Sequence, residues 1–414
     1  MRVKIIGLGA AGNKAAICAV ENGVVNVEDT MLVNSTLKDI PADYQGKANC
    51  HEFENSYGGC GKERSLSFDL CKQSLQDDIF GLTDFLKAET SEQAEVVVIV
   101  ASSEGGTGSG AAPLFANYIN SVYGIQVHIY ALAGFEDDVR GMRNTVEFFK
   151  EMSQEFTVEC TKNSNFLDMC SGNKFKAEKE ANLEFCKKIS ILAGLQLRDC
   201  DHNIDPTDLL KLSTTPEYML IEYAPINEKI KTKDQFRQIV VDAINNSKAM
   251  DPEITSDKIE KNLGQKRLGV IINIREECVD FIDYYDILVE KFGVPYEKFE
   301  HVQHEKDMPE FVAFISAGLP LPTEEVERVY EQYEKTVNRV NTNDSSQFFN
   351  TIRSKATGEK DTMFEHYGAT EKKTVSKADF FSSTKSASKP GFSTPSVHLE
   401  LKEKKDSSDK MNEY

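Results

Sequence analysis

The chain has 414 residues, of which 28% are charged and 40% apolar, and its formal net charge is −19 at pH 7. This length allows two domains with substantial cores, and the acidic balance excludes a body that coats nucleic acid directly. No apolar run is long enough to span a bilayer, and a strand-like run begins at Val3, so we expect neither a membrane segment nor a removable leader. The nine cysteines are odd in number and form no C-x-x-C pair, which favours reduced thiols in a cytoplasm.

A glycine-rich turn follows the first strand candidate, Val3–Gly7. The letters GLGAAG place Gly9 and Gly12 at the G-x-G-x-x-G spacing of a dinucleotide-binding turn. An NAD or flavin enzyme would then need an acidic residue at the end of its second strand, to bind the ribose. That strand, Thr30–Val33, ends instead in the polar residues 34–36. A Rossmann-type NAD(P)-dependent oxidoreductase is therefore the weaker alternative.

The second glycine-rich stretch, Ser102–Pro113, reads SSEGGTGSGAAP. It follows the strand-like run Glu95–Ala101, five of whose seven residues are Val or Ile, and leads into an apolar run that predicts a helix with Pro113 in its first turn. A buried strand, a glycine loop and a helix start together form a phosphate-binding arrangement. Backbone N–H groups of the glycines can approach phosphate oxygens, and Thr107 and Ser109 add hydroxyl donors.

The string GGTGSG in this setting resembles the signature loop of the tubulin/FtsZ superfamily. Gly12-Asn13 is similar to the end of that superfamily's first loop, and residues 34–36 stand where its second loop does. A third glycine cluster, Ser56–Arg64, reads SYGGCGKER and resembles the loop that senses the γ-phosphate, particularly in the plasmid and phage segregation tubulins of the TubZ group. The resemblance covers about residues 1–340, and its specific motifs lie in 1–210.

The resemblance implies an α/β fold with an N-terminal Rossmann-like GTP-binding domain, a long central core helix, a second smaller α/β domain, a C-terminal helix and a disordered tail. We place these parts at 1–175, 176–210, 211–321, 322–343 and 344–414. The last part is rich in Ser, Thr and Lys and poor in large apolar residues, which is typical of a disordered segment. Before it, Thr323–Val340 has one apolar face at helical spacing, able to pack on its own subunit or on a neighbour.

The resemblance also implies that GTP or GDP binds with Mg²⁺, although no residue is assigned to the metal. Glu136 occupies the place of the ribose-binding carboxylate. Asn182, in the predicted core helix Ala177–Leu197, is placed to recognise the guanine edge, because a side-chain amide both donates and accepts. Glu178 replaces the superfamily's stacking aromatic, which leaves Phe175 or Phe185 to stack on the base. The expected nucleotide contacts are Gly9, Gly12, Asn13, Asn34, Gly58, Gly59, Gly61, Lys62, Gly105, Gly106, Thr107, Gly108, Ser109, Glu136, Arg140, Asn163 and Asn182, with Arg64 as a further phosphate contact.

The loop Asp199–Asp208, DCDHNIDPTD, supports two interpretations at once. Its last four residues form an ordinary helix start, with Asp205 as N-cap, proline at the first position and an acid at the third. Asn203, Asp205 and Asp208 also match the spacing of the superfamily's catalytic loop. The resemblance implies that they complete the site of the next subunit and orient and deprotonate the attacking water.

The resulting functional prediction is a filament-forming GTPase that hydrolyses GTP at the contact between successive subunits. Its expected role is plasmid or phage DNA segregation, in which the tail 344–414 binds a DNA-binding adaptor at a centromere-like site. A cell-division or phage-positioning filament is the alternative with the same chemistry. Residues from Tyr218 onward alternate strand and helix candidates without a glycine loop, and we assign them to assembly. We expect no direct DNA binding by the acidic body, no membrane contact and a cytoplasmic location.

Overall fold

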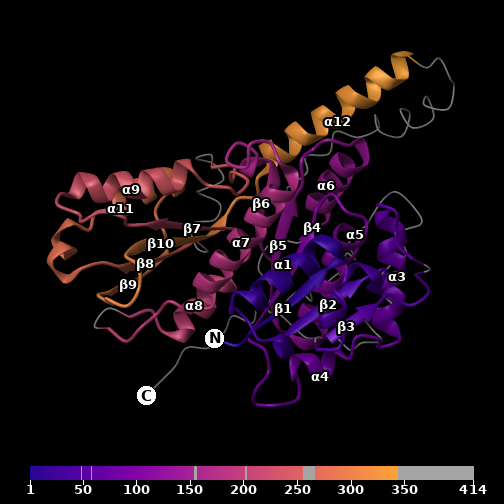
Figure 1. Cartoon of the computed structure of the whole chain (residues 1–414), viewed down its shortest axis with the longest axis horizontal. Coiled ribbons are helices and arrows are strands. Elements are labelled where there is room, and N and C mark those ends of the chain that lie inside the picture. The colour runs from indigo at the N-terminus through magenta and orange to yellow at the C-terminus, as the bar shows by residue number, and fades with distance from the viewer. Residues whose placement is uncertain (48, 57, 153–155, 201–202, 255–265, 344–414) are drawn as a thin grey trace, which may run out of the picture.

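The computed structural model describes residues 1–343 except 48, 57, 153–155, 201–202 and 255–265, and for 338–343 it describes the backbone alone. The predicted tail 344–414 therefore lies outside the described residues. Within them, ten strands form one sheet in the order β3-β2-β1-β4-β5-β6-β7-β10-β8-β9 (Figure 1). The mixed α/β fold expected from the sequence is thus confirmed.

The sheet is parallel from β3 to β7, whereas β10 runs antiparallel to both β7 and β8, and β9 is parallel to β8. Strands β2 and β4 are buried almost throughout, as expected for parallel strands covered by helices on both faces. The strand bounds are β1 Val3–Leu8, β2 Thr30–Asn34, β3 Asn49–Glu52, β4 Val96–Ser102, β5 Gln126–Ala133, β6 Thr157–Lys162, β7 Glu217–Pro225, β8 Arg267–Asn273, β9 Glu297–Gln303 and β10 Phe311–Leu319.

Helices cover the two faces of the sheet, and alternate residues of each strand enter opposite cores. On β4, Val97 and Ile99 contribute to the core under α3, α5, α6, α9 and α12, whereas Val98 and Val100 contribute to the core under α1, α7 and α8. The α-helices are α1 Gly9–Glu21, α2 Ala42–Gln45, α3 Arg64–Gln76, α4 Leu82–Leu86, α5 Thr107–Tyr118, α6 Val139–Glu151, α7 Lys174–Leu192, α8 Pro206–Ser213, α9 Lys233–Asn245, α11 Tyr285–Phe292 and α12 Thr323–Asn343.

Two predicted helices are each interrupted in the structure. The sequence predicts one helical stretch over Glu63–Lys87, after the third glycine cluster. The structure divides it into α3 and α4, because Asp78 and Gly81 adopt left-handed backbone conformations (φ 58° and 55°) that end one helix and precede the next. Among the helix candidates after Tyr218, the sequence predicts one over Val279–Phe292. The structure divides it into a 3₁₀ turn ending at Phe281 and α11. The short edge strands β3 and β9 were not predicted, since their charged, half-exposed residues give little apolar signal.

Pro113 lies inside α5, and the prediction that it occupies the first turn is wrong. The helix begins at Thr107, within the glycine stretch itself, so Pro113 cannot donate a backbone hydrogen bond to the carbonyl of Ser109 one turn earlier. The Arg64 guanidinium compensates by donating to that carbonyl at 2.8 Å. A buried arginine from α3 therefore satisfies the acceptor that the proline leaves open.

The helices α7 and α12 connect the two halves of the molecule. Figure 1 shows α7 running between the part of the sheet that contains β1 to β6 and the part that contains β7 to β10, while α12 lies along α6 and extends beyond it. Val326 and Val329 are buried and Tyr330 and Tyr333 pack beside them, so this apolar face of α12 packs on its own subunit. No helix in the described residues is long and apolar enough to cross a membrane.

Candidate functional site

The predicted phosphate loops meet at one edge of the sheet, where parallel strands β1, β2, β4 and β5 end. A Cβ added to Gly9 after β1 would lie 3.0 Å from the amide nitrogen of Gly108, and the Ser35 hydroxyl after β2 is 3.0 Å from that of Thr107. A Cβ on Gly106 would come within 2.6 Å of the Lys62 Cα, so the third glycine cluster joins the same edge. These loops are separate in sequence and come together because the carboxyl ends of parallel strands share an edge.

Two helices begin at this edge without a side-chain cap, α1 at Gly9 and α5 at Thr107. Their first-turn N–H groups and the positive ends of their dipoles converge on the same space, which favours an anion such as a phosphate. Position 9 requires glycine because its φ is 74°, in the left-handed region. Position 12 requires glycine because a Cβ there would collide with the Val100 carbonyl. Gly12 therefore allows α1 to lie directly against β4.

Asn144 of α6 holds two of the glycine loops together, and sequence analysis missed it. This buried amide donates to the carbonyl oxygens of Lys62 at 3.1 Å, Glu104 at 3.0 Å and Gly105 at 3.2 Å. Its neighbours in sequence give no motif, so only the contact itself identifies it. The predicted residues Asn13 and Asn34 brace β2 and the loop after it, because Asn13 of α1 donates to the Val33 carbonyl of β2 and Asn34 donates to the Asp39 carboxylate.

Charged side chains surround the edge, and each has a protein partner. The Lys62 ammonium is 2.5 Å from Asp138, and Arg140 donates to the Gly61 carbonyl at 2.8 Å. Gly58, Gly59 and Gly61 all have positive φ and form the outer rim beside Lys62. Arg64 does not face this edge: it is buried and pairs with Glu151 at 2.6 Å, so the expected phosphate contact is wrong.

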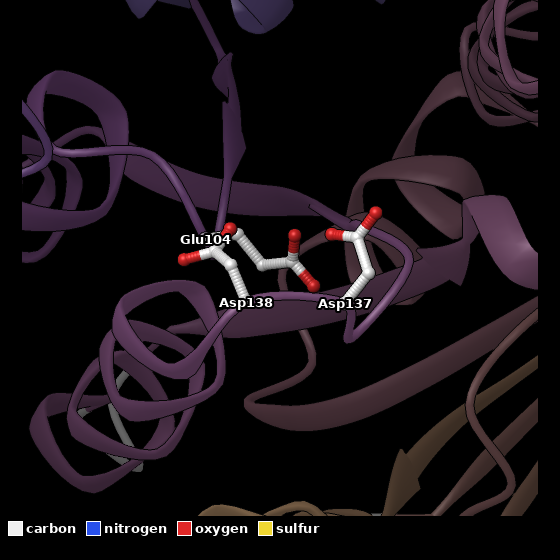
Figure 2. A group of neighbouring side chains, drawn as sticks. All are labelled: Glu104, Asp137 and Asp138. Carbon is white, nitrogen blue, oxygen red and sulfur yellow. The ribbon is translucent and has the colours of Figure 1, made fainter.

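Three carboxylates gather beside the glycine loop, Glu104 after β4 and Asp137 and Asp138 after β5 (Figure 2). Their nearest oxygens all lie within 4.8 Å of one another. Burial raises the pKa of Glu104, although its carboxylate accepts a hydrogen bond from the Glu136 amide at 2.9 Å. Partial burial is the largest single influence on the pKa of Asp138 and raises it, but the hydrogen bonds from Lys62 and from the Gly141 and Arg140 amides, together with the Lys62 charge, outweigh burial and lower the pKa. Oxygen ligands of this kind suit Mg²⁺, and sequence analysis assigned none of them to a metal.

The start of α7 places the residues expected to contact the base and sugar. Asn182 is half-buried on α7, and neither oxygen nor nitrogen of its amide has a hydrogen-bond partner among the described residues; the Oδ1 atom of Asn163 is buried and also lacks one. Phe185 is fully buried, edge-on to Tyr130 at 4.8 Å, so it cannot stack on a base. Phe175 remains the candidate for stacking on the base, because it is 78% exposed in the first turn of α7.

A second aromatic side chain near this helix start was missed by sequence analysis. Phe135 follows β5, and the Lys174 ammonium lies 5.2 Å from its ring centroid. Lys174 also pairs with Asp137, so the start of α7 contacts the loop after β5 at two points. The signal in the sequence is an aromatic directly before the acidic run EDD at the end of a buried strand.

The predicted catalytic loop lies at the opposite end of α7. Asp205 caps α8 by accepting from the Asp208 amide at 2.8 Å, and the Asp208 carboxylate accepts from the Asp205 amide at 3.4 Å, which confirms the capping interpretation. Asn203 and Asp205 are exposed and Asp208 is half-buried, while residues 201–202 of this loop lie outside the described part. The 19 residues of α7 span about 28 Å, so these side chains cannot reach the glycine loops of their own subunit.

No family model matches the chain. Curated relatives include the tubulin-like protein CetZ2 of Haloferax volcanii, 26% identical over 149 residues (33% of this chain, 38% of that protein), and the tubulin-like protein TubZ of Clostridium botulinum C phage, 23% identical over 218 residues (49% and 57%). The cell division protein FtsZ of Mycoplasmopsis pulmonis is 28% identical over 154 residues (36% of each). The matched region spans only 36% to 57% of the length of these relatives.

Solved structures show the same similarity over most of the chain. Clostridium botulinum phage c-st TubZ superposes with a TM-score of 0.62 at 15% identity, covering 81% of this chain and 98% of that one. The GTPγS-bound protofilament of Haloferax volcanii CetZ2 gives 0.64 at 17% identity (82% and 100%), and the two-stranded filament of TubZ-Bt gives 0.63 at 15% (87% and 94%). The molecule thus has the tubulin-like α/β fold. Its relatives in sequence and structure are TubZ, CetZ and FtsZ, which confirms the resemblance to the tubulin/FtsZ superfamily.

Proposed function

We propose that this chain is a GTPase that binds GTP or GDP at the glycine-rich edge of its sheet and assembles head to tail into filaments. The observation that supports this most directly is the convergence of two uncapped helix starts, at Gly9 and Thr107, on one space lined by glycines. The similarity to a GTPγS-bound protofilament and to a two-stranded filament supports the same assignment.

In this proposal the phosphates are bound by the N–H groups of α1 and α5, with Lys62 beside them. Magnesium would be held by Glu104, Asp137 and Asp138, the described carboxylates whose oxygens lie together at this edge. When bound, the ion supplies positive charge that neutralises the phosphate oxygens. To bind magnesium, the three carboxylates would have to exchange their present partners for the ion, because Lys62, Lys174 and the Glu136 amide contact them in this structure.

The base and sugar would be bound beside the start of α7. The amides of Asn182 and Asn163 offer donors and acceptors that complement guanine or ribose. Phe175 is exposed there and offers a stacking surface. Glu136 offers a carboxylate oxygen for a ribose hydroxyl, although two cations already contact that carboxylate.

Hydrolysis would require a second subunit. Proton transfer from water needs a base within hydrogen-bond reach, and Asp205 and Asp208 lie at the far end of α7 from their own glycine loops. A head-to-tail contact would place these carboxylates of one subunit at the phosphate edge of the next. Such a contact does not close on itself and therefore extends into a filament.

The cellular role we propose is segregation of plasmid or phage DNA through an adaptor bound by residues 344–414, in a cytoplasm. The motif GCGKER and the similarity to phage TubZ favour it over the cell-division alternative, which the similarity to FtsZ keeps open. The test is a binding experiment with the full-length chain and with a chain ending at 343. A DNA-binding protein that binds the first but not the second would support the segregation role over the cell-division role.

Titration calorimetry should show that the chain binds GTP in the presence of magnesium, and that ATP and NAD give no comparable heat. The physical basis is that a backbone phosphate cradle suits all these ligands, whereas the Asn182 amide, placed to donate to O6 and to accept from N1–H, would recognise the guanine edge. An Asn182→Ala variant should therefore lose the preference for GTP over ATP. Tight NAD binding without a GTP signal would instead establish the Rossmann oxidoreductase alternative.

Removing residues 344–414 should leave GTP hydrolysis and polymerisation close to those of the full chain. All of the glycine loops, α7 and the catalytic loop lie before residue 344, and α12 already packs on α6. Binding of an adaptor–DNA complex should fall. Phosphate release and sedimentation measure the first two properties, and loss of hydrolysis in the shortened chain would show that our domain boundary is wrong.

A further inference from the structure

The C-terminal helix α12 contacts the loop that follows β5, at the predicted ribose position. The guanidinium of Arg328 lies 3.2 Å from the Glu136 Oε1 atom, and the Gln332 amide donates to the Glu136 carbonyl at 3.3 Å. Arg328 and Glu136 are 192 positions apart in the sequence. α12 thus holds one residue of the candidate nucleotide site by both its side chain and its backbone.

The contact belongs to a closed network of four charged side chains. Lys162, at the end of β6, lies 3.4 Å from Glu136 and 2.7 Å from Glu325, and Arg328 lies 3.5 Å from Glu325. The Lys162 side chain is 8% exposed and that of Glu136 13%, so solvent and salt screen the pair less than a surface pair. Two elements, β6 and α12, therefore fix the same carboxylate.

Glu136 needs this support because its backbone conformation is unfavourable. Its φ of 55° lies in the left-handed region, which costs a residue other than glycine free energy unless the surroundings hold it there. The surroundings do so at three points: Glu104 accepts from the Glu136 amide, Gln332 donates to its carbonyl, and the cations hold its carboxylate.

Both cations contact the same oxygen of Glu136. Arg328 and Lys162 approach Oε1, whereas Oε2 has no hydrogen-bond partner among the residues that the structure describes. One oxygen is thus anchored, and the other remains as an acceptor for a hydroxyl group of a ligand.

We propose that Arg328 and Gln332 of α12 are positioning residues of the nucleotide site, which fix Glu136 so that its second carboxylate oxygen accepts a hydrogen bond from the ribose. This inference rests on the proposed binding of GTP at the glycine-rich edge. It makes α12 part of the nucleotide site of its own subunit. A change in the position of α12 then changes the affinity for the ribose, and nucleotide binding stabilises α12 in return.

The test compares GTP with 2′,3′-dideoxy-GTP on the full chain by titration calorimetry. The wild type should prefer GTP about tenfold, as expected for loss of a hydrogen bond to a charged acceptor. The Arg328→Ala/Gln332→Ala variant should reduce that preference to about twofold, and Arg328→Lys should retain most of it. The matched control is Lys335→Ala, which removes an exposed ion pair with Glu331 on the same helix but does not contact the loop; its preference should equal that of the wild type.

The outcomes separate the inference from the function on which it rests. Absence of GTP binding by the wild type would overturn the proposed function itself. GTP binding without preference over the dideoxy nucleotide, or a preference unchanged in the double variant, would overturn the role of Arg328 and Gln332 alone. An equal loss in Lys335→Ala would also overturn it, by showing that the effect comes from general loosening of α12. Should the double variant melt below assay temperature, the single variants Arg328→Gln and Arg328→Lys supply the same comparison.

Discussion

Replacing Asp208 by alanine should lower GTP hydrolysis by about 10²–10⁴-fold while leaving the GTP affinity of the monomer near that of the wild type. Removal of a positioned general base typically has this effect on rate. The structural loss is small by comparison, because an acidic residue in a first helical turn contributes about 0.3–1 kcal/mol. Asp208 accepts a long hydrogen bond from the Asp205 amide and lies 4.0 Å from Lys211, contacts of the kind that contribute little.

The filaments of this variant should assemble and persist. GTP would still bridge the contact between subunits, but its γ-phosphate would not be released, so the contact would not weaken. A minority of mutant subunits should then stabilise wild-type filaments, because each mutant disables the site of its neighbour. Light scattering recorded alongside phosphate release measures both effects.

The matched control is Asp234→Ala, which removes an acidic residue from the first turn of α9 and so causes a similar loss of helix stabilisation. It should hydrolyse GTP at the wild-type rate. Equal hydrolysis by Asp208→Ala and wild type would restrict Asp208 to its capping role. Loss of GTP binding by the isolated Asp208→Ala monomer would instead place the residue in the pocket of its own subunit and refute action on a neighbouring one.

Lys188→Met should lower the free energy of unfolding by about 3–5 kcal/mol at pH 8. The Lys188 side chain is 1% exposed in α7, and its ammonium donates to Glu159 of β6 at 2.8 Å and lies 3.7 Å from Glu222 of β7. It therefore joins the central helix to the two strands at which the halves of the sheet meet. Methionine of similar length fills the space but leaves both buried carboxylates without a cation, which is the costly change.

The loss should be smaller at pH 5 than at pH 8. Burial raises the pKa of Glu222 to about 7, although Lys188 lowers it, and burial likewise raises the pKa of Glu159. A carboxyl group with a raised folded-state pKa binds its proton more tightly when folded, so its contribution to stability is fully present below the unfolded pKa and is lost as pH rises through the folded one. Without Lys188 both folded pKa values rise further, which makes the variant's stability fall more steeply with pH.

Chemical denaturation at the two pH values measures this difference. Lys187→Met is the matched control, since Lys187 is the neighbouring residue with a 60% exposed side chain and a single distant partner, Glu184 at 3.9 Å. It should change the free energy of unfolding by no more than about 0.5 kcal/mol at either pH. A Lys188→Met variant as stable as this control at pH 8 would show that the ion pairs of Lys188 with Glu159 and Glu222 do not stabilise the folded chain.

Local sequence was sufficient to predict most of the framework. The runs of Val and Ile at β1 and β4 predict buried parallel strands, and each is followed directly by a glycine stretch that begins a helix. Because parallel strands end at one edge, these local signals also predict that the glycine stretches meet. The capped start of α8, with Asp205 as N-cap and Asp208 as the acidic third residue, is likewise a property of four consecutive residues, and it was predicted correctly.

What sequence alone left undecided depends on partners distant in the chain. Arg64 stands in a motif that resembles a phosphate-binding loop. Its guanidinium instead donates to the Ser109 carbonyl, which Pro113 leaves without a donor, and pairs with Glu151. Only the packing of α3 on α5 and α6 could decide this. Phe185 and Phe175 are the same residue type on one helix, and the sheet beneath α7 buries the first and leaves the second exposed.

The amino-acid sequence by itself determined the apolar strands β1 and β4, the glycine turns that follow them and hence the edge at which a phosphate group can bind, because these follow from backbone preferences and from apolar runs of a few residues. Only the tertiary structure decided which charged and aromatic side chains face that edge. Glu136 is held by Arg328 from the last described helix, and Lys188 is paired across two strands. The physical reason is that ion pairs and burial depend on distances in space, and residues 192 positions apart carry no local signal of their contact.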